Sequence, residues 1–234
     1  MGDFVPALLV VDMQEDFCPP NGALAVENGR SIAPIINDLL CNRRFAIRVA
    51  TQDWHPKDHI SFAVNHPPPN NLPFESFITM SNPVPGKETQ TKPQQLWPVH
   101  CVAGTEGASM IPEIKTDCVD LFVKKGMDPG VEMYSVFADA FGNVDSTKSV
   151  DTDLKAVLKG KNVTDVFIAG LAGDYCVKCT AIDAIKAGFR AWVIEEGTLC
   201  VVPGLGWEKT KEELEEDGVH VIHVDGPEID MLRA

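Results

Sequence analysis

The feature that most constrains the fold is a series of short apolar segments of strand length, separated by segments with helical periodicity. Segments 8–11 and 166–169 are almost continuously apolar, which is typical of strands that are buried on both faces of a parallel sheet. Because strands and helices alternate along the chain, we predict a three-layer α/β/α fold with a mainly parallel, doubly wound central sheet.

The expected elements follow from these patterns. We predict strands at residues 7–11, 45–51, 119–124, 165–171, 191–195 and 219–224. We predict helices at residues 31–41, 152–159, 175–187 and 207–217. Ser31 is the expected N-cap of the first helix, and Gly188 is the expected C-cap of the third.

One proline-rich region interrupts the alternation. Residues 56–115 contain ten of the 17 prolines, together with His59, His66, Trp97 and His100. A segment this long without secondary structure is uncommon inside a compact domain unless it is functional. We therefore predict one domain over residues 1–234, with residues 56–115 as an elaborated active-site insert folded over the carboxyl edge of the sheet.

Charge and cysteine content exclude several classes of partner. The chain has 34 acidic and 20 basic residues, a formal net charge of −14, and no basic run longer than two residues. This composition argues against binding to nucleic acid and against docking on an anionic membrane. The seven cysteines, without a recognisable signal peptide or transmembrane segment, predict reduced thiols in a cytoplasmic or nuclear protein.

Reactive side chains follow four of the predicted strands. They are Asp12, the pair Asp53 and His55, the pair Lys124 and Lys125, and Cys176. Binding sites in open parallel sheets form beyond the carboxyl ends of the strands. We therefore expect these groups to meet at one edge of the sheet.

Cys176 is the candidate nucleophile. It follows a predicted strand and a glycine-containing turn, and it lies at the start of a predicted helix. The positive end of the helix dipole lowers the pKa of a thiol there, and backbone N–H groups of the turn can stabilise an oxyanion. The alternatives are a buried structural cysteine and a redox pair with Cys179, although such redox pairs normally occur near the first strand of a small domain.

Asp12 and one of two lysines are the candidate proton-transfer groups. Asp12 ends an apolar strand, where burial raises the pKa of a carboxyl group, so it can act as a general base. Its alternative role is to cap the following turn. Strand alternation places Lys124 and Lys125 on opposite faces but does not decide which lysine faces the site, and both could simply be solvated.

Asp53 and His55 form a candidate metal-binding pair. In an extended segment residues i and i+2 point the same way, so the carboxylate and the imidazole converge. This donor set suits Zn²⁺ or a similar ion. A third ligand must come from elsewhere, and His59, His66 and His100 are the candidates.

Taken together, these motifs resemble those of the nicotinamidase family of isochorismatase-like cysteine hydrolases, most closely its fungal members. The matching stretches are residues 10–17, 51–62, 96–101, 125–126, 134–137 and 170–180. The resemblance implies hydrolysis of nicotinamide to nicotinate and ammonia, through a cysteine thioester, as a step of NAD salvage. It also implies one Zn²⁺, or another divalent transition metal, per chain.

The resemblance further implies roles for individual residues. The implied catalytic triad is Asp12, Lys125 and Cys176, with Lys125 selected because it directly precedes a glycine. The implied metal ligands are Asp53, His55 and His100. The implied oxyanion hole consists of the backbone N–H groups of Ala172 and Cys176, with a cis peptide before the alanine. Phe17 and Trp97 are implied to sandwich the pyridine ring. Ser61 is implied to lie near the water shell of the metal, and Ser135 to lie in the layer of residues behind those that contact the substrate or metal.

Two positions depart from the family pattern, and two other functions remain open. Asp174 stands where we expect Glu in close relatives, and Lys124 stands where an acid is common. The alternatives are hydrolysis of a different small amide, or a non-catalytic redox or metal-binding thiol protein that uses Cys176 and Cys179. The expected partner is a small molecule, and homo-oligomers are left open. The acidic run at residues 208–217 is expected to be a solvated helix face.

Overall fold

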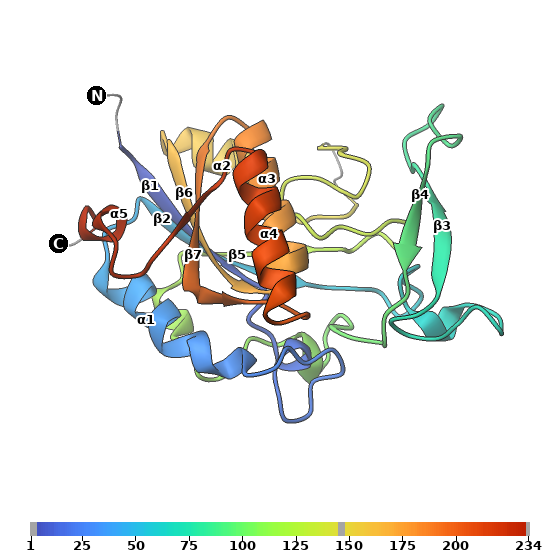
Figure 1. Cartoon of the computed structure of the whole chain (residues 1–234). Coiled ribbons are helices and arrows are strands. Elements are labelled where there is room, and N and C mark those ends of the chain that lie inside the picture. The colour runs from blue at the N-terminus through green and yellow to red at the C-terminus, as the bar shows by residue number, and fades with distance from the viewer. Residues whose placement is uncertain (1–3, 145–147, 233–234) are drawn as a thin grey trace.

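The centre of the computed structural model is a six-stranded parallel sheet (Figure 1). The structure describes residues 4–144 and 148–232. The strand order is β5-β2-β1-β6-β7-β8. These strands are β1 (Pro6–Val11), β2 (Ile47–Asp53), β5 (Leu121–Lys125), β6 (Asp165–Leu171), β7 (Arg190–Leu199) and β8 (His220–Ile222). The predicted doubly wound α/β fold is confirmed.

Helices cover both faces of the sheet (Figure 1). One face carries α1 (Ala33–Asn42) and α5 (Pro227–Asp230); the other carries α2 (Leu154–Gly160), α3 (Lys178–Lys186) and α4 (Leu205–Glu216). Alternation along β1 supplies both cores, because Leu8 and Val10 pack on the α1 side while Leu9 and Val11 pack on the other. The apolar runs in the sequence therefore mark strands that are buried on both faces.

The sequence analysis named a cap residue for two helices, and the structure has a different cap residue in each. Ser31 is not the N-cap of α1, because a 3₁₀ turn at Gly29–Ile32 runs directly into the helix and makes Ile32 the cap residue. The C-cap of α3 is Ala187, one residue before the predicted Gly188, which follows directly after the cap. The φ of Gly188, 90°, is left-handed, and its N–H donates to the Ile185 carbonyl at 2.9 Å.

The proline-rich insert contains a β-hairpin that the sequence analysis missed. Strands β3 (Phe77–Ser81) and β4 (Thr91–Gln95) pair antiparallel and project away from the main sheet (Figure 1). Pro93 lies within β4, and a proline normally argues against a strand. The insert returns to the sheet edge through backbone bonds from Trp97 N to Ser61 O and from His55 N to Cys101 O, at 2.8 and 3.0 Å.

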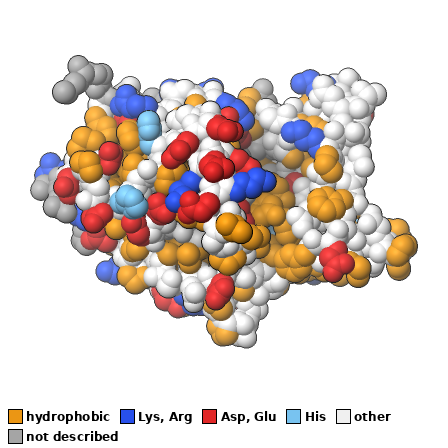
Figure 2. Space-filling view, in the orientation of Figure 1, with side chains coloured by type: hydrophobic (Ala, Val, Ile, Leu, Met, Phe, Trp, Pro, Cys, Tyr) orange, Lys and Arg blue, Asp and Glu red, His pale blue; other side chains and the backbone are white. Residues whose placement is uncertain are grey.

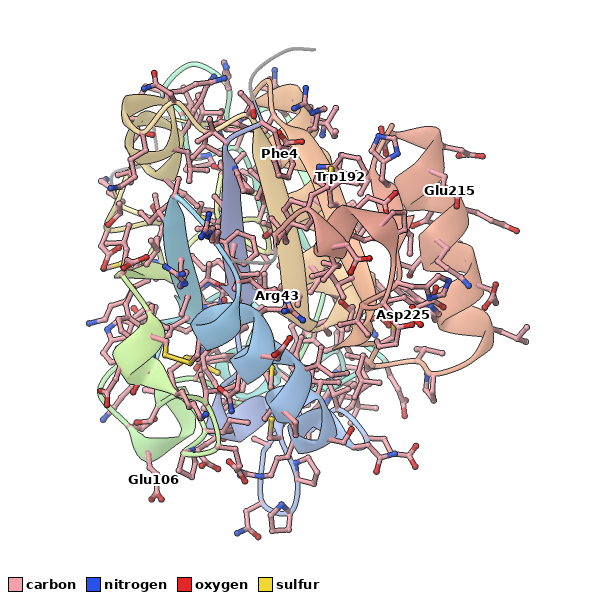
Figure 3. All side chains as sticks on the ribbon, turned by 90° about the vertical axis from the view of Figure 1, so that its left-hand side faces the viewer. Phe4, Arg43, Glu106, Trp192, Glu215 and Asp225 are labelled. Carbon is pink, nitrogen blue, oxygen red and sulfur yellow. A yellow bond between two sulfur atoms is a disulfide. The ribbon has the colours of Figure 1, made fainter. Side chains whose placement is uncertain are left out.

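Cys41 and Cys118 form a disulfide, so the prediction that all seven cysteines are reduced is wrong for this pair. The bond joins α1 to the 3₁₀ turn at Thr116–Cys118 and is drawn in yellow beside α1 in Figure 3. The two Cα atoms are 5.7 Å apart, within the range that a disulfide requires. Because the cysteines are 77 residues apart, sequence spacing gave no sign of the contact. The other five cysteines are free thiols.

We expect loss of this disulfide to lower stability without changing catalysis. The chain-entropy model gives a cost of about 4.5 kcal/mol for a loop of this length. The Cys41→Ser/Cys118→Ser variant, and the wild-type protein in dithiothreitol, should both unfold at lower urea concentration. Turnover should be unchanged below the unfolding transition. Equal urea midpoints for the oxidised and reduced protein would show that the bond does not stabilise the fold.

The surface over α4 is highly charged (Figure 2). Lys209 pairs with Glu213 at 3.6 Å, and Lys211 pairs with Glu208 at 3.0 Å. The acidic run is therefore a solvated helix face, as predicted. Within residues 4–144 and 148–232, no helix has the length and apolarity that a membrane crossing needs.

Candidate active site

A small pocket lies beyond the carboxyl ends of the central strands. Its free volume is about 30 Å³, roughly enough for two water molecules. The residues that line it are Phe17, Leu24, Asp53, Trp97, His100, Glu132, Tyr134, Ala172, Tyr175, Cys176 and Val201. Segments that are distant in sequence therefore meet here, and the insert contributes Trp97 and His100.

Lys125 is the charged centre of a buried cluster at the base of this pocket. Its Nζ lies 2.9 Å from Asp12 Oδ2, 2.5 Å from Asp53 Oδ1 and 3.4 Å from Cys176 Sγ. All four side chains are buried. One ammonium therefore contacts two carboxylates and the thiol in a region of low dielectric constant, where such contacts are strong.

The structure resolves which lysine faces the site. Lys125 is fully buried, whereas the Nζ of Lys124 lies over the Trp54 ring at 4.0 Å on the other side of the strand. Asp12 is positioned by Thr51, whose hydroxyl donates to Asp12 Oδ1 at 2.6 Å. Thr51 was not singled out in the sequence, because a threonine inside a strand carries no distinctive signal.

Gly126, directly after Lys125, allows the His55 ring to pack closely against this part of the chain. Its φ is 69°, and a Cβ added there would lie only 2.5 Å from the His55 ring. Its carbonyl oxygen lies 2.8 Å from His55 Nδ1. A larger residue at position 126 would therefore displace His55, which explains the glycine directly after Lys125.

The direction of the pKa shift of Cys176 differs from the sequence prediction. Burial raises the pKa of its thiol well above the usual value; Lys125 opposes this rise, and the negative charge of Asp12 adds to it. The predicted lowering of this pKa is therefore wrong for the resting site, because burial in a region of low dielectric constant destabilises the thiolate. The thiol keeps its proton until a base removes it.

Asp12 is suited to be that base. Burial raises the pKa of its carboxyl group, as predicted, although Lys125 opposes the rise. Burial lowers the pKa of Lys125, but Asp12 and Asp53 outweigh it and hold that pKa well above the usual value. The lysine therefore stays charged while a proton can pass between Cys176 and Asp12.

Asp53, His55 and His100 lie together as a buried set of metal-type ligands. Their donor atoms are all within 4.8 Å of one another. The Nδ1 atoms of His55 and His100 each lie 2.8 Å from a backbone carbonyl, which leaves both Nε2 atoms to face the site. Among the described residues, the buried His55 Nε2 has no hydrogen-bond partner. This donor set fits a divalent ion such as Zn²⁺.

The other two histidines considered as third ligands are placed differently. His59 stacks on His55 with ring centroids 4.1 Å apart, and its Nδ1 lies 2.8 Å from Ser61 Oγ. His59 also forms a possible ligand group with His55 and the buried Glu132. His66 Nε2 instead lies 2.7 Å from the Ile60 carbonyl oxygen. Ser61 therefore contacts His59, which in turn stacks on the candidate metal ligand His55.

Aromatic side chains form the walls of the pocket. Trp97 donates from Nε1 to the Tyr134 hydroxyl at 3.0 Å and meets Tyr175 edge to face, with centroids 5.2 Å apart. Phe17 lines the same pocket. The sequence analysis did not assign a role to either tyrosine, although Tyr134 begins a stretch that carried the family resemblance.

The remaining predicted residues fall inside and outside the pocket. Ala172 and Cys176 both line it, and the peptide bond between Leu171 and Ala172 is cis, as the resemblance implied. Ser135 does not line it; its hydroxyl accepts the Phe137 N–H at 3.1 Å in a local turn. The sequence analysis missed the lining residues Glu132, Leu24 and Val201, which lie in loops without periodic patterns.

The fold and the clustered side chains define an isochorismatase-like hydrolase. The isochorismatase domain model matches residues 6–225, and the chain belongs to this family. It is 40% identical to the nicotinamidase of Acinetobacter baylyi over 188 residues, which cover 80% of this chain and 78% of that protein. It is 36% identical to the nicotinamidase of Saccharomyces cerevisiae, over 92% of this chain and 98% of that protein.

Two solved structures show the same architecture. The yeast nicotinamidase bound to the inhibitor nicotinaldehyde has a TM-score of 0.84 at 35% identity. The match covers 94% of this chain and 100% of that one. The Pyrococcus horikoshii pyrazinamidase in complex with zinc has a TM-score of 0.68 at 32% identity, covering 93% of this chain and 98% of that one.

Proposed function

We propose that the protein is a nicotinamidase, which hydrolyses nicotinamide to nicotinate and ammonia as a step of NAD salvage. The observation that carries this proposal is the buried cluster of Asp12, Lys125 and Cys176 at the base of an aromatic pocket. Relatives with 36–40% identity are nicotinamidases, and one similar structure holds nicotinaldehyde. A neutral aromatic amide also suits a chain with a net charge of −14, which would repel polyanions.

In the first half of the proposed reaction, a cysteine thioester forms. Asp12 takes the proton of the Cys176 thiol, and the sulfur attacks the carboxamide carbon. The charged Lys125 stabilises the negative charge of the cluster. The backbone N–H groups of Ala172 and Cys176 receive the oxyanion. Asp12 then transfers its proton to the leaving nitrogen, and ammonia departs.

In the second half, water hydrolyses the thioester. Asp12 is again a carboxylate and accepts a proton from the water, which attacks the acyl carbon. The C–S bond breaks, Asp12 returns its proton to sulfur, and the product leaves as nicotinate after its new carboxyl group releases a proton to solvent. Phe17 and Trp97 hold the ring on its two faces, and Tyr134 fixes the Trp97 indole through its hydrogen bond.

Asp53, His55 and His100 are the residues that would hold the metal ion. Such an ion supplies a Lewis acid that can bind a pyridine nitrogen and so orient the ring. Ser61 would support this site by holding His59 against His55.

We expect His100→Ala to lose bound metal and activity together, because it removes one of three buried ligands. Elemental analysis of the purified variant should show much less than one ion per chain, with ammonia release reduced by about 10- to 100-fold or more. His66→Ala is the matched control, because His66 bonds a backbone carbonyl outside the ligand group. Full metal content in His100→Ala would redirect the assignment to His59.

The substrate assignment is tested by ammonia release from a panel of amides. Nicotinamide should be hydrolysed with the highest kcat/KM, followed by other heteroaromatic carboxamides, with aliphatic amides far lower. A clear preference for a non-aromatic amide would favour a different amidohydrolase of the same family. No release from any amide would favour the non-catalytic thiol alternative.

A further inference from the structure

The loop after β7 supplies one wall of the proposed substrate pocket. Val201 lines the pocket from the loop between β7 and α4, whereas Cys176 lines it from the helical turn Gly173–Val177 that follows β6. The next three residues, Val202, Pro203 and Gly204, are exposed, and α4 begins directly after them. This wall therefore belongs to an exposed connection, whereas Asp12, Lys125 and Cys176 are held in the buried core.

Asp174 holds this loop in place. Its Oδ1 accepts the Val201 N–H at 2.9 Å, and its Oδ2 accepts the Val202 N–H at 3.0 Å. One carboxylate thus binds two successive backbone N–H groups across 27 residues of sequence. Hydrogen bonds to a charged acceptor are about twice as strong as neutral ones. We call these two hydrogen bonds the tether. Asp174, which makes them, lies two residues before the proposed nucleophile, Cys176.

A close packing contact reinforces the tether. Gly173 directly precedes Asp174, and a Cβ added to it would lie 2.7 Å from Cys200 Sγ. The turn at Gly173 therefore packs directly against the loop at Cys200, with no room for a larger side chain at position 173. The turn that presents Tyr175 and Cys176 to the pocket is the same turn that fixes the Val201 wall.

The pocket is narrow, with a cavity volume of about 30 Å³, so the position of each wall affects the space that a ring can occupy. The backbone after Val201 is exposed, and the Asp174 carboxylate ties it to the turn before Cys176.

We propose that Asp174 is a positioning residue that determines substrate specificity by holding Val201 against the ring of the bound amide. This inference rests on the proposed function. When the tether is intact, the wall contacts an unsubstituted ring and excludes a ring that carries an extra group on this side. When the tether is lost, the wall relaxes, the unsubstituted ring loses contact, and larger rings gain space.

The test compares kcat and KM for nicotinamide and for a series of ring-methylated nicotinamides. For Asp174→Ala we expect KM for nicotinamide to rise about tenfold, equivalent to about 1.4 kcal/mol, while kcat stays within about threefold. For at least one methylated amide, kcat/KM relative to nicotinamide should rise about tenfold. Asp174→Glu, which restores two carboxylate acceptors, should recover most of the affinity for nicotinamide.

Further variants separate this role from a general effect on folding. Val201→Ala should produce the same change in selectivity, and the double variant should show no further change, because Asp174 acts through Val201. Glu196→Ala is the matched control: its carboxylate accepts the Val224 N–H at 2.9 Å, contacts His223 at 2.7 Å and lies outside the pocket lining. Should Asp174→Ala fail to fold, Asp174→Asn, which keeps one acceptor, should show the intermediate KM.

The outcomes distinguish the two levels of inference. Wild-type KM and selectivity in Asp174→Ala, or equal changes in Glu196→Ala, would overturn the role of Asp174 while leaving the nicotinamidase assignment intact. Independent, additive effects of Asp174→Ala and Val201→Ala would also overturn it. If the wild-type enzyme releases no ammonia from nicotinamide, the proposed function fails. The same selectivity ratios are then measured on the amide that the enzyme does hydrolyse.

Discussion

Replacing Cys176 with Ala is expected to reduce kcat for ammonia release by at least about 10⁴-fold. The variant keeps the aromatic walls and the metal-type ligands but has no atom that can form the acyl intermediate. Because Cys176 is buried and an alanine is smaller, the fold should be retained, with a modest loss of stability from the small cavity. Circular dichroism and metal content should match the wild-type protein.

Cys179→Ala is the matched control for this experiment. Cys179 lies three residues further along the same helical segment, and burial raises the pKa of its thiol to about 11. The redox alternative requires both cysteines, whereas the hydrolase requires only Cys176. Near wild-type turnover in Cys179→Ala therefore supports the hydrolase, and equal loss in both variants would support a function of the pair.

Replacing Lys125 with Met is expected to remove activity and to destabilise the protein strongly. It leaves Asp12 and Asp53 buried without the ammonium that contacts both of them. Loss of one partner from a buried ion pair costs about 3–5 kcal/mol, because the remaining charge is uncompensated. Urea unfolding measures the loss of stability, and ammonia release should fall to the level of Cys176→Ala.

The pH dependence of this destabilisation provides a second check. Without Lys125, the pKa of the Asp12 carboxyl group should rise further, because the ammonium lowers it in the wild-type protein. A raised carboxyl pKa makes the folded state bind protons more readily than the unfolded state, so the deficit of the variant should shrink as the pH falls. Lys124→Met is the control, and it should lose about 1 kcal/mol or less, since the Nζ of Lys124 lies over the Trp54 ring and not among the buried carboxylates. A Lys125→Met variant as stable as Lys124→Met would contradict the buried cluster.

The central sheet was predictable from the sequence because burial on both faces leaves a simple signal. Strand β6 was predicted with its observed bounds, Asp165–Leu171, since every residue in it is buried. The convergence of the reactive side chains was also predictable, because the carboxyl ends of parallel strands meet at one edge. Strand alternation left the choice between Lys124 and Lys125 open. The family resemblance implied Lys125, and the structure places its Nζ 2.9 Å from Asp12 Oδ2 and 3.4 Å from Cys176 Sγ.

The features that were missed depend on contacts between distant segments. The Cys41–Cys118 bond links residues 77 positions apart, and no local pattern indicates it. The raised pKa of Cys176 comes first from its burial by surrounding elements, which a local sequence pattern does not show. Val201 is placed in the pocket by Asp174, through hydrogen bonds to backbone groups that have no sequence signature.

The acyl-enzyme intermediate provides the most direct test of the proposed chemistry. Wild-type enzyme is mixed with excess nicotinamide, quenched in acid within the first turnovers, digested and analysed by mass spectrometry. We predict a nicotinoyl thioester on the peptide that contains Cys176, and no adduct in Cys176→Ala or on peptides with the other cysteines. Rapid ammonia release without any acyl group on Cys176, or with the acyl group on another residue, would contradict the mechanism.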